Sequence, residues 1–206
     1  MPSLRRILST FALLALTLPA GARAIEPALL DSLRAGGYVL YFRHAQTDWN
    51  QSDNAKGAGW ASCAPARMRQ LSDIGRETAR KVGEALRRLK IPVGQVLASE
   101  FCRTQQTAQL LGLGEVSVTR SLINATHADE AGGTEALREA ARQLMATPPP
   151  QGKNTVLVAH GNVFMLVSDR RPVEAGAAVL KPDGRGGFQV VAHIGPDEWI
   201  RAAEGR

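Results

Sequence analysis

Short apolar runs alternate with longer amphipathic segments along most of the chain. Four of these runs are apolar or rich in β-branched side chains, which predicts short strands. They cover residues 38–42, 93–98, 116–119 and 155–159. The first and the last are apolar at nearly every position, as expected for strands that are buried on both faces.

Helical periodicity is present in the segments around these strands. Apolar residues recur at three- and four-residue spacing, and Ser72 stands where the longest segment needs an N-cap. The predicted helices cover residues 27–34, about 73–89, 102–111 and about 134–145, and helical residues follow Gly161. Two more strands, 177–181 and 187–194, flank the turn signal Asp183-Gly184 and predict a hairpin.

Strands and helices alternate at the spacing of βαβ units. The pattern predicts a single α/β domain over residues 25–206, with three α/β/α layers and a mostly parallel central sheet. One stretch stands apart, because residues 45–70 are polar and irregular and contain Trp49 and Trp60. Connections of this length are usually functional. We expect the two tryptophans either to line a substrate pocket or to pin the loop to the domain.

The first 24 residues have the features of a secretory leader. Arg5 and Arg6 precede an apolar stretch over residues 7–18, and Ala22-Arg23-Ala24 offers small residues where a signal peptidase cleaves. A membrane anchor is the alternative, but the apolar stretch is well short of the roughly 20 residues that a span needs. We therefore predict a signal peptide over residues 1–24, cleavage after Ala24, a periplasmic or secreted protein and no stable membrane anchor.

Removal of the leader changes the net charge. The full chain of 206 residues has 25 basic and 19 acidic residues and a net charge of +6. The leader contains three arginines and no acid, so the mature chain has 22 basic residues and a net charge of +3. This low value argues against nucleic acid as a partner.

One helix nevertheless carries a run of basic side chains. The residues are Arg76, Arg80, Lys81, Arg87, Arg88 and Lys90. We interpret them as a solvated helix face, with contact to anionic lipid or lipopolysaccharide as the alternative.

Unusual side chains follow three of the predicted strands. Arg43 and His44 end the first, Arg103 comes shortly after the second, and His160 follows the fourth. In open α/β sheets, ligands bind beyond the carboxyl ends of the strands, so these residues are expected to meet in one crevice. Guanidinium groups bind phosphate through paired donors, and a neutral imidazole can attack phosphorus.

This set of side chains predicts phosphoryl transfer to His44 without a metal ion or other cofactor. The neighbouring guanidiniums disfavour a proton on His44, and His160 can donate to an equatorial phosphoryl oxygen in the transition state. A zinc site is the other reading of two histidines and two cysteines, but their spacings fit no common zinc pattern. His127 and His193 receive no role.

Four sequence blocks resemble those of the histidine phosphatase superfamily, also called phosphoglycerate mutase-like. Residues 43–50, Arg-His-Ala-Gln-Thr-Asp-Trp-Asn, resemble its Arg-His-Gly signature. Residues 71–75 with Ala79 are similar to its next block, a capped helix start. Residues 99–104 with Thr107-Ala108 resemble the block that holds another active-site arginine, and His160-Gly161-Asn162 resembles the last block. The blocks occur in the family's order.

The resemblance implies roles for individual residues. His44 would accept the phosphoryl group, while Arg43, Arg103 and His160 would hold the phosphate. Asn50 would add a hydrogen bond to it. Ala45 stands where the family usually has glycine, a change that other members tolerate.

The general acid is the main departure from the family pattern. Family members commonly carry a glutamate just past the third strand, and this chain has Asn124 there. A missing acid costs about 10²–10⁴-fold on a poor leaving group. The substitutes considered are Asp48, Glu100, Asp129 and Glu130.

Cys63 and Cys102 are the only cysteines. Export to an oxidising compartment favours a disulfide between them, and two buried free thiols are the alternative.

Together these features predict a phosphatase that hydrolyses phosphomonoesters or phosphohistidine through a phosphohistidine on His44. A catalytically weak or inactive phosphate-binding module is the alternative, and a mutase fits poorly with export. The expected partner is a small phosphorylated substrate or a cell-envelope phosphate. Sugar phosphates, lipopolysaccharide core phosphates and phosphorylated peptides or proteins all fit.

Overall fold

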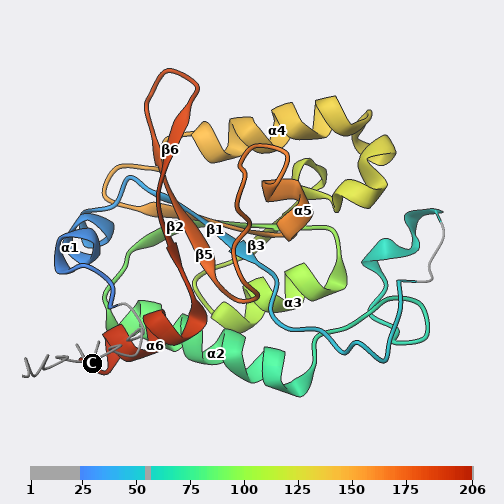
Figure 1. Ribbon diagram of the computed structural model, residues 1–206, viewed down its shortest axis with the longest axis horizontal. Helices are drawn as coiled ribbons and strands as arrows, with labels where there is room; N and C mark the ends of the chain where they lie inside the picture. The colour runs from blue at the N-terminus through green and yellow to red at the C-terminus, as the bar shows by residue number, and fades with distance from the viewer. Residues whose placement is uncertain (1–23, 54–56, 206) are drawn as a thin grey trace, which may run out of the picture.

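The computed structural model describes residues 24–53 and 57–205 (Figure 1). A six-stranded sheet with the strand order β3-β2-β4-β1-β5-β6 forms its centre. The leader predicted over residues 1–24 lies outside the described residues except for Ala24, and it stays a prediction. Within the described ranges, no helix is both long and apolar enough to cross a membrane.

The sheet is mixed, with four parallel strands on one side and an antiparallel pair at the other edge. Its strands are β1 (Val39–Arg43), β2 (Val93–Ser99), β3 (Val116–Thr119), β4 (Asn154–Ala159), β5 (Ala177–Pro182) and β6 (Phe188–Ile194). The first four run parallel to one another, while β5 is antiparallel to β1 and forms a hairpin with β6. The predicted hairpin and the mostly parallel sheet are therefore confirmed.

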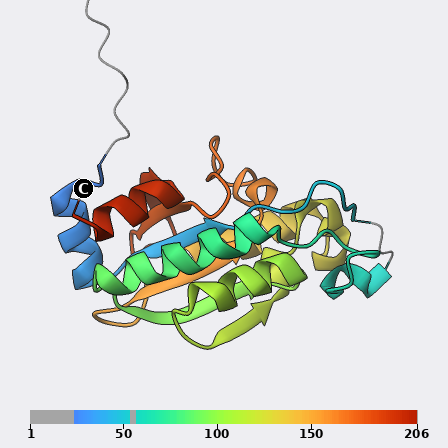
Figure 2. The same cartoon turned by 90° about the horizontal axis from the view of Figure 1, so that it is seen from below.

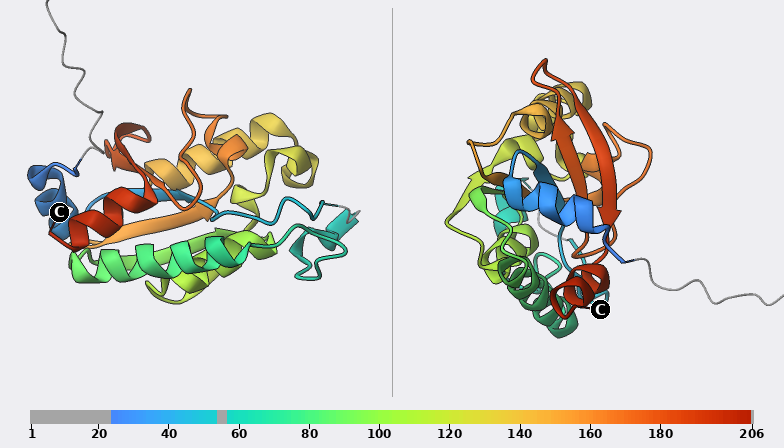
Figure 3. Two further views of the ribbon diagram at one scale, coloured as in Figure 1. Left: turned by 60° about the horizontal axis from the view of Figure 1, so that its bottom comes forward. Right: turned by 90° about the vertical axis from the view of Figure 1, so that its left-hand side faces the viewer.

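Helices cover both faces of the sheet (Figure 3). They are α1 (Pro27–Ala35), α2 (Asp73–Arg88), α3 (Cys102–Leu111), α4 (Thr134–Ala146), α5 (Gly161–Phe164) and α6 (Pro196–Ala203), with 3-10 turns η1 (Gly57–Ala61), η2 (Arg120–Leu122) and η3 (Ala125–Ala131). The helices α2, α3 and α6 lie on one face, seen from below in Figure 2, and α4 and α5 lie on the other. Together with the solved structures compared below, this confirms the predicted three-layer fold.

Alternating side chains of β1 explain why both faces are covered. Leu40 and Phe42 pack into the core beneath α2, α3 and α6, while Val39 and Tyr41 pack into the core beneath α4 and α5. Successive side chains of a strand point to opposite faces, so an entirely apolar strand requires a helical layer on each side.

The N-terminus of α2 is fixed against the chain that follows β1. The Ser72 hydroxyl accepts a hydrogen bond from the Gly75 backbone N–H at 3.0 Å, and the Ser72 backbone N–H donates to the Gln46 carbonyl at 3.0 Å. A Cβ atom at Gly75 would lie only 2.1 Å from the Gln46 oxygen, so only glycine fits here. This contact holds the segment just after His44 in place.

Two features of the fold differ from the sequence prediction. The helix α6 was not predicted, although Pro196, Asp197 and Glu198 form a typical helix start and the Glu198 carboxylate accepts from the Gly195 N–H. Its Trp199 is fully buried in the core beside α2. The turns η2 and η3 were also unforeseen, because 3-10 turns leave no clear hydrophobic period.

Charged residues on the exposed face of α2 are largely paired within the helix. Glu77 contacts Arg80 and Lys81, and Glu84 contacts Arg88. The Arg87 side chain donates to the carbonyl of Leu111. These contacts favour the interpretation of this set as a solvated helix face over that of a lipid-binding surface.

Candidate active site

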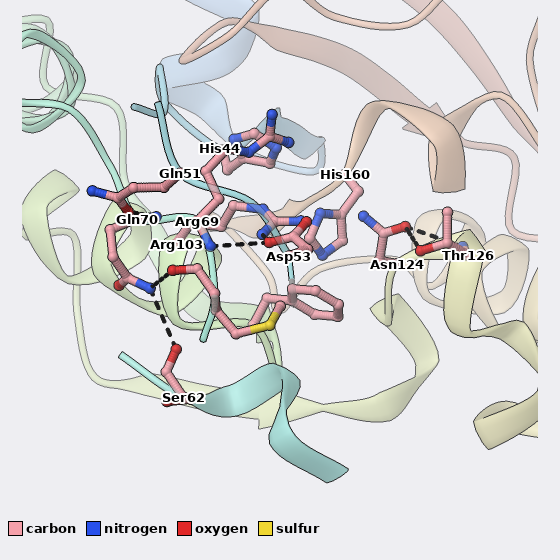
Figure 4. Close-up of polar contacts among 12 residues, drawn as sticks. His44, Gln51, Asp53, Ser62, Arg69, Gln70, Arg103, Asn124, Thr126 and His160 are labelled. Atoms are coloured by element: carbon pink, nitrogen blue, oxygen red, sulfur yellow. Dashed lines mark hydrogen bonds and ion pairs between the residues drawn. The ribbon is translucent and has the colours of Figure 1, made fainter. Parts of the chain in front are cut away.

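The strand order brings the carboxyl ends of β1, β4 and β2 side by side at one edge of the sheet. β4 lies between β1 and β2, and the backbone N–H of His44 donates to the Ala159 carbonyl at 2.9 Å. His160 follows immediately, at the N-cap of α5. Arg103 lies in the first turn of α3, directly beyond the end of β2. The residues predicted from three distant segments therefore surround a single crevice (Figure 4).

His44 is buried and held in a single ring orientation. Its Nδ1 lies 2.9 Å from the carbonyl oxygen of Ala45, and a carbonyl can only accept, so Nδ1 carries the proton. The other ring nitrogen, Nε2, is then left with its lone pair. Burial lowers the pKa of His44 to about 3, with further lowering by Arg103 and Arg43. From the sequence we expected the neighbouring arginines to lower this pKa, whereas burial lowers it more.

His160 faces the same crevice and is fixed on two sides. Its ring centroid lies 5.5 Å from that of His44, and the Ser99 hydroxyl lies 3.0 Å from its Nε2. The Tyr41 hydroxyl donates to its backbone carbonyl at 2.9 Å. Burial and then Arg103 lower the pKa of His160 well below its usual value. When Ser99 donates to Nε2, the neutral ring carries its proton on Nδ1.

Arg103 is almost fully buried, with 2% of its side chain exposed. Its guanidinium lies over the Phe101 ring at 4.6 Å and contacts the Asp53 carboxylate at 2.9 Å. The Thr107 hydroxyl donates to the Arg103 carbonyl and accepts from the Ala45 N–H, which ties α3 to the chain beside His44. This bond gives a physical reason for the Thr107 position in the third sequence block.

Arg43 approaches the crevice from the end of β1. Its guanidinium contacts the Glu174 carboxylate at 3.0 Å. A Cβ atom at Gly161 would lie 3.3 Å from Arg43 Cδ and 2.9 Å from Arg171 Cδ, so glycine here makes room for both side chains. Burial lowers the pKa of Arg43, and Glu174 partly offsets that effect.

Arg69 is a further arginine of this cluster, and the sequence analysis missed it. It lies near enough to lower the pKa values of His44, Arg43 and Arg103. Its guanidinium stacks on the Trp49 ring at 4.0 Å. Arg69 stands in the irregular stretch before α2, where no strand end or motif marked it.

The pocket has unused donors that suit an oxyanion. His160 Nδ1, Arg69 Nε and Arg103 Nε are buried and have no hydrogen-bond partner among the described residues. Buried polar atoms are normally paired, so three such donors around one crevice indicate a site for an anion. Among residues 24–53 and 57–205, no group of three or more His, Cys, Asp or Glu side chains could hold a metal ion.

The sequence comparison agrees with this geometry. Residues 39–145, which are more than half of the chain, match the histidine phosphatase superfamily (branch 1). The chain belongs to this superfamily. A search of the curated proteins finds no match.

Solved structures of phosphatases share the fold of this histidine phosphatase superfamily member at low sequence identity. The protein histidine phosphatase SixA complexed with tungstate is 18% identical, with a TM-score of 0.50, over 78% of this chain and 97% of SixA. Phosphoserine phosphatase from Entamoeba histolytica, in complex with 3-phosphoglyceric acid, is 13% identical with a TM-score of 0.53, over 79% and 98%. An Escherichia coli K-12 protein assigned as an alpha-ribazole-5'-P phosphatase is 15% identical with a TM-score of 0.55, over 78% and 98%. These likenesses confirm the α/β fold.

Two asparagines predicted from the superfamily pattern lie in different environments. Asn50 is exposed, and its backbone N–H donates to the Asp48 carboxylate. Its side chain forms no hydrogen bond with either histidine among the described residues. Asn124 lies closer, because its carbonyl oxygen accepts from Asn162 and Thr126 and its amide group is beside His160 in Figure 4. An amide can donate a hydrogen bond there but cannot supply a proton.

None of the four acids considered from the sequence forms a hydrogen bond or ion pair with the site arginines or the two histidines among the described residues. Asp48 accepts from the Asn50 N–H and the Gln51 amide, and Glu100 pairs with Arg120 on the surface. Asp129 and Glu130 are exposed on η3. A different carboxylate, that of Asp53, lies at the crevice and contacts Arg103.

A disulfide and a small apolar cluster hold the long loop of this superfamily member. Cys63 in the loop is bonded to Cys102, the residue directly before Arg103, with 5.3 Å between their Cα atoms. Trp60 is buried with Phe101 and four other residues, which are Met68, Ile123, Ala128 and Leu137. Trp60 therefore pins the loop, whereas Trp49 is 70% exposed beside Arg69.

Proposed function

We propose that the protein is a phosphatase that forms a covalent phosphohistidine on His44 and then hydrolyses it. The observation that carries this proposal is the buried His44, whose Nδ1 lies against the Ala45 carbonyl. Burial and the nearby Arg103, Arg43 and Arg69 lower its pKa, which favours a neutral ring with a free Nε2. Most histidines near neutral pH are partly protonated, and this environment removes that competition. Its substrates would be phosphomonoesters or phosphohistidine.

The first step is attack of His44 Nε2 on phosphorus. The bond between phosphorus and the leaving oxygen breaks as the bond to Nε2 forms, and the ring becomes positively charged. The Ala45 carbonyl at Nδ1 offsets that charge. The arginines hold the equatorial oxygens, and His160 Nδ1 donates to one of them, so charge in the transition state meets fixed donors.

The second step is hydrolysis. A water molecule attacks phosphorus and loses a proton, the bond to Nε2 breaks, and His44 leaves as a neutral imidazole with its proton still on Nδ1. Phosphate is released and the starting protonation state of the ring is restored.

Trapping of the intermediate tests the proposal directly. Purified protein incubated with a labelled phosphate donor and quenched in base should carry one acid-labile phosphoryl group on His44. The variant His44→Ala should show neither label nor turnover, while His193→Ala, which alters a histidine on β6 that packs against Phe164, should retain both. Equal labelling of wild type and His44→Ala would show that the assignment is wrong.

Asn124 favours a second candidate, a phosphate-binding protein with little turnover. That protein would bind phosphate or vanadate tightly but would not release nitrophenol from 4-nitrophenyl phosphate. A burst of nitrophenol equal to the protein concentration excludes this candidate. Mixing with phosphoglycerates tests for mutase activity, which we expect to be absent.

We further propose that the protein acts outside the cytoplasm, on phosphate in the cell envelope or beyond it. The leader-like residues 1–24 and the bond between Cys63 and Cys102 support this location. Expression of the full chain in a bacterium should give a periplasmic protein that begins at Ile25. A chain that retains Met1 and stays in the cytoplasm would contradict export.

A further inference from the structure

We infer that Asp53 is the proton donor and acceptor of this active site. This inference rests on the proposed function. The superfamily pattern places Asn124 where a glutamate is usual, so the position that normally supplies the proton cannot do so. Asp53 comes from a different part of the chain, the loop that follows β1. Its carboxylate is hydrogen-bonded to the guanidinium that is expected to hold the phosphate.

One oxygen of the Asp53 carboxylate accepts two hydrogen bonds, and the other is available to carry a proton. Oδ1 accepts from Arg103 Nη1 at 2.9 Å and from the Arg69 backbone N–H at 3.1 Å. Oδ2 forms no hydrogen bond among the described residues. Two donors on one oxygen orient the carboxylate and leave the second oxygen able to carry a proton.

The Asp53 carboxylate is bonded to the same guanidinium that the proposed function assigns to phosphate binding. In the view of Figure 4, its carboxylate is drawn between Arg103 and His160. A phosphate bound to the same guanidinium would place its ester oxygen next to Asp53.

A second carboxylate, that of Glu174, also contacts an active-site arginine but is placed differently. Glu174 forms a backbone bridge with Arg43 and lines a separate hollow with Val173, Gly195 and Arg201. It supports Arg43 from outside the crevice. Asp53 is therefore the better-placed acid of the two.

Solvent contact and loop bonding both fit an acid that also acts as a base. The Asp53 side chain is 33% exposed, so water can reach it for the hydrolytic step. The loop segment that carries Asp53 is bonded to the end of the loop just before α2, where the Gln51 side-chain oxygen accepts from the Gln70 N–H at 2.9 Å. Asp53 is thus open to water yet held in position.

The proton balance of the reaction is complete with Asp53. In the first step its carboxyl proton moves to the leaving oxygen while phosphorus bonds to His44 Nε2, and a neutral alcohol departs. In the second step the Asp53 carboxylate takes a proton from the attacking water. Asp53 then carries its proton again, and no further reactant is needed.

Leaving groups of different acidity test this role. An alkyl phosphate needs a proton on its leaving oxygen, whereas nitrophenolate leaves readily without one. Asp53→Asn should lower kcat/KM for glycerol phosphate by about 10²–10⁴-fold and that for 4-nitrophenyl phosphate by less than about tenfold. With the aryl ester it should also accumulate phosphorylated His44, because the hydrolytic step has lost its base.

Asp48→Asn is the matched control, since Asp48 is an acid of the same loop that bonds only within the loop in the described contacts. It should change kcat/KM for both esters by the same small factor. Equal losses on both esters in Asp53→Asn would overturn the inference in favour of a positioning role, and equal gains would indicate a carboxylate that merely competes with phosphate. A wild-type protein that neither labels His44 nor hydrolyses the aryl ester would instead overturn the proposed function.

Discussion

Two regions form the active-site crevice, and the fold holds them in different ways. His44, His160 and Arg103 are buried at strand ends and are fixed by backbone and side-chain bonds inside the sheet layers. Opposite them lies the loop over residues 45–71, whose Asp53 and Arg69 are partly exposed. The loop is held by side-chain hydrogen bonds, Trp60 and a disulfide.

The difference separates two parts of the proposed chemistry. The buried side sets the protonation of the nucleophile, because burial lowers the pKa of His44. In the proposed mechanism, the loop side supplies the proton through Asp53. Changes on the buried side should therefore affect every substrate, whereas changes in the loop should depend on the substrate or on the redox state.

Among the changes that follow, the largest effect on both classes of ester is expected on the buried side, for Arg103→Lys. Lysine offers a point charge without the paired donors of guanidinium, and its ammonium loses the flat contact with Phe101. We expect kcat/KM to fall by about 10²–10³-fold for aryl and alkyl phosphates alike. Steady-state kinetics on both substrates measure it.

The control is Arg80→Lys on the exposed face of α2, which should change the rate by less than about twofold. A loss for Arg103→Lys with only one class of ester would contradict the view that the buried side acts on every substrate.

The buried side was also the part that could be predicted from sequence. Arg43, His44 and His160 directly follow apolar strands, and parallel strands bring their ends together whatever the rest of the chain does. Arg103 begins the helix after β2 and follows the same rule. The layers of the fold could also be predicted from the sequence. The strands β1 and β4 are largely apolar, so both faces of the sheet must be covered there.

The loop side could not be predicted, because nothing local specifies its contacts. Arg69 and Asp53 are ordinary charged residues in a polar stretch, and they reach the crevice only because the loop folds back on itself. Asp53 was not among the acids considered from the sequence, whereas Asp48 was, because it stands within the signature block. Of the loop contacts, the pairing of Cys63 with Cys102 was expected from export, and anchoring of the loop by a tryptophan was one of two alternatives.

The next largest effect should come from the disulfide, which tests how the loop is held. Closing 39 residues contributes about 3–4 kcal/mol to the free energy of unfolding in the chain-entropy account. The double variant Cys63→Ser, Cys102→Ala should lose about that much in urea unfolding. A reducing agent should destabilise the wild type but leave the variant unchanged. Equal responses to the reducing agent would mean that the bridge does not form.

A smaller effect is expected for Arg69→Gln, on the loop side. Arg69 adds a guanidinium to the phosphate site but leaves His44 and Arg103 in place. Loss of a charged hydrogen bond of this kind should raise KM by about 10- to 100-fold with little change in kcat. Trp49→Ala, which removes only the ring stacked on Arg69, should change KM by a few-fold at most. A fall in kcat with KM unchanged would place Arg69 in the chemical step instead.

The last and smallest effect, over the measured range from pH 6.5 to 5.0, is a dependence of stability on pH that the buried imidazoles impose. Burial lowers the pKa of His44 to about 3, whereas an unfolded histidine titrates near pH 6.5. Below about pH 6.5 this histidine binds a proton in the unfolded chain but stays neutral in the folded protein. The stabilisation is therefore complete above about pH 6.5 and is lost as the pH falls toward 3, at up to about 1.4 kcal/mol per pH unit for each such imidazole.

Urea unfolding of wild type and His44→Asn at pH 7.5, 6.5, 5.5 and 5.0 isolates the contribution of His44. Carboxylates that titrate in this range do so in both proteins, so the difference between the two curves removes their effect. The wild type should lose more stability than the variant between pH 6.5 and 5.0. Parallel curves would mean that His44 takes up a proton as readily in the folded protein as in the unfolded chain, and the buried region would then not keep its nucleophile neutral.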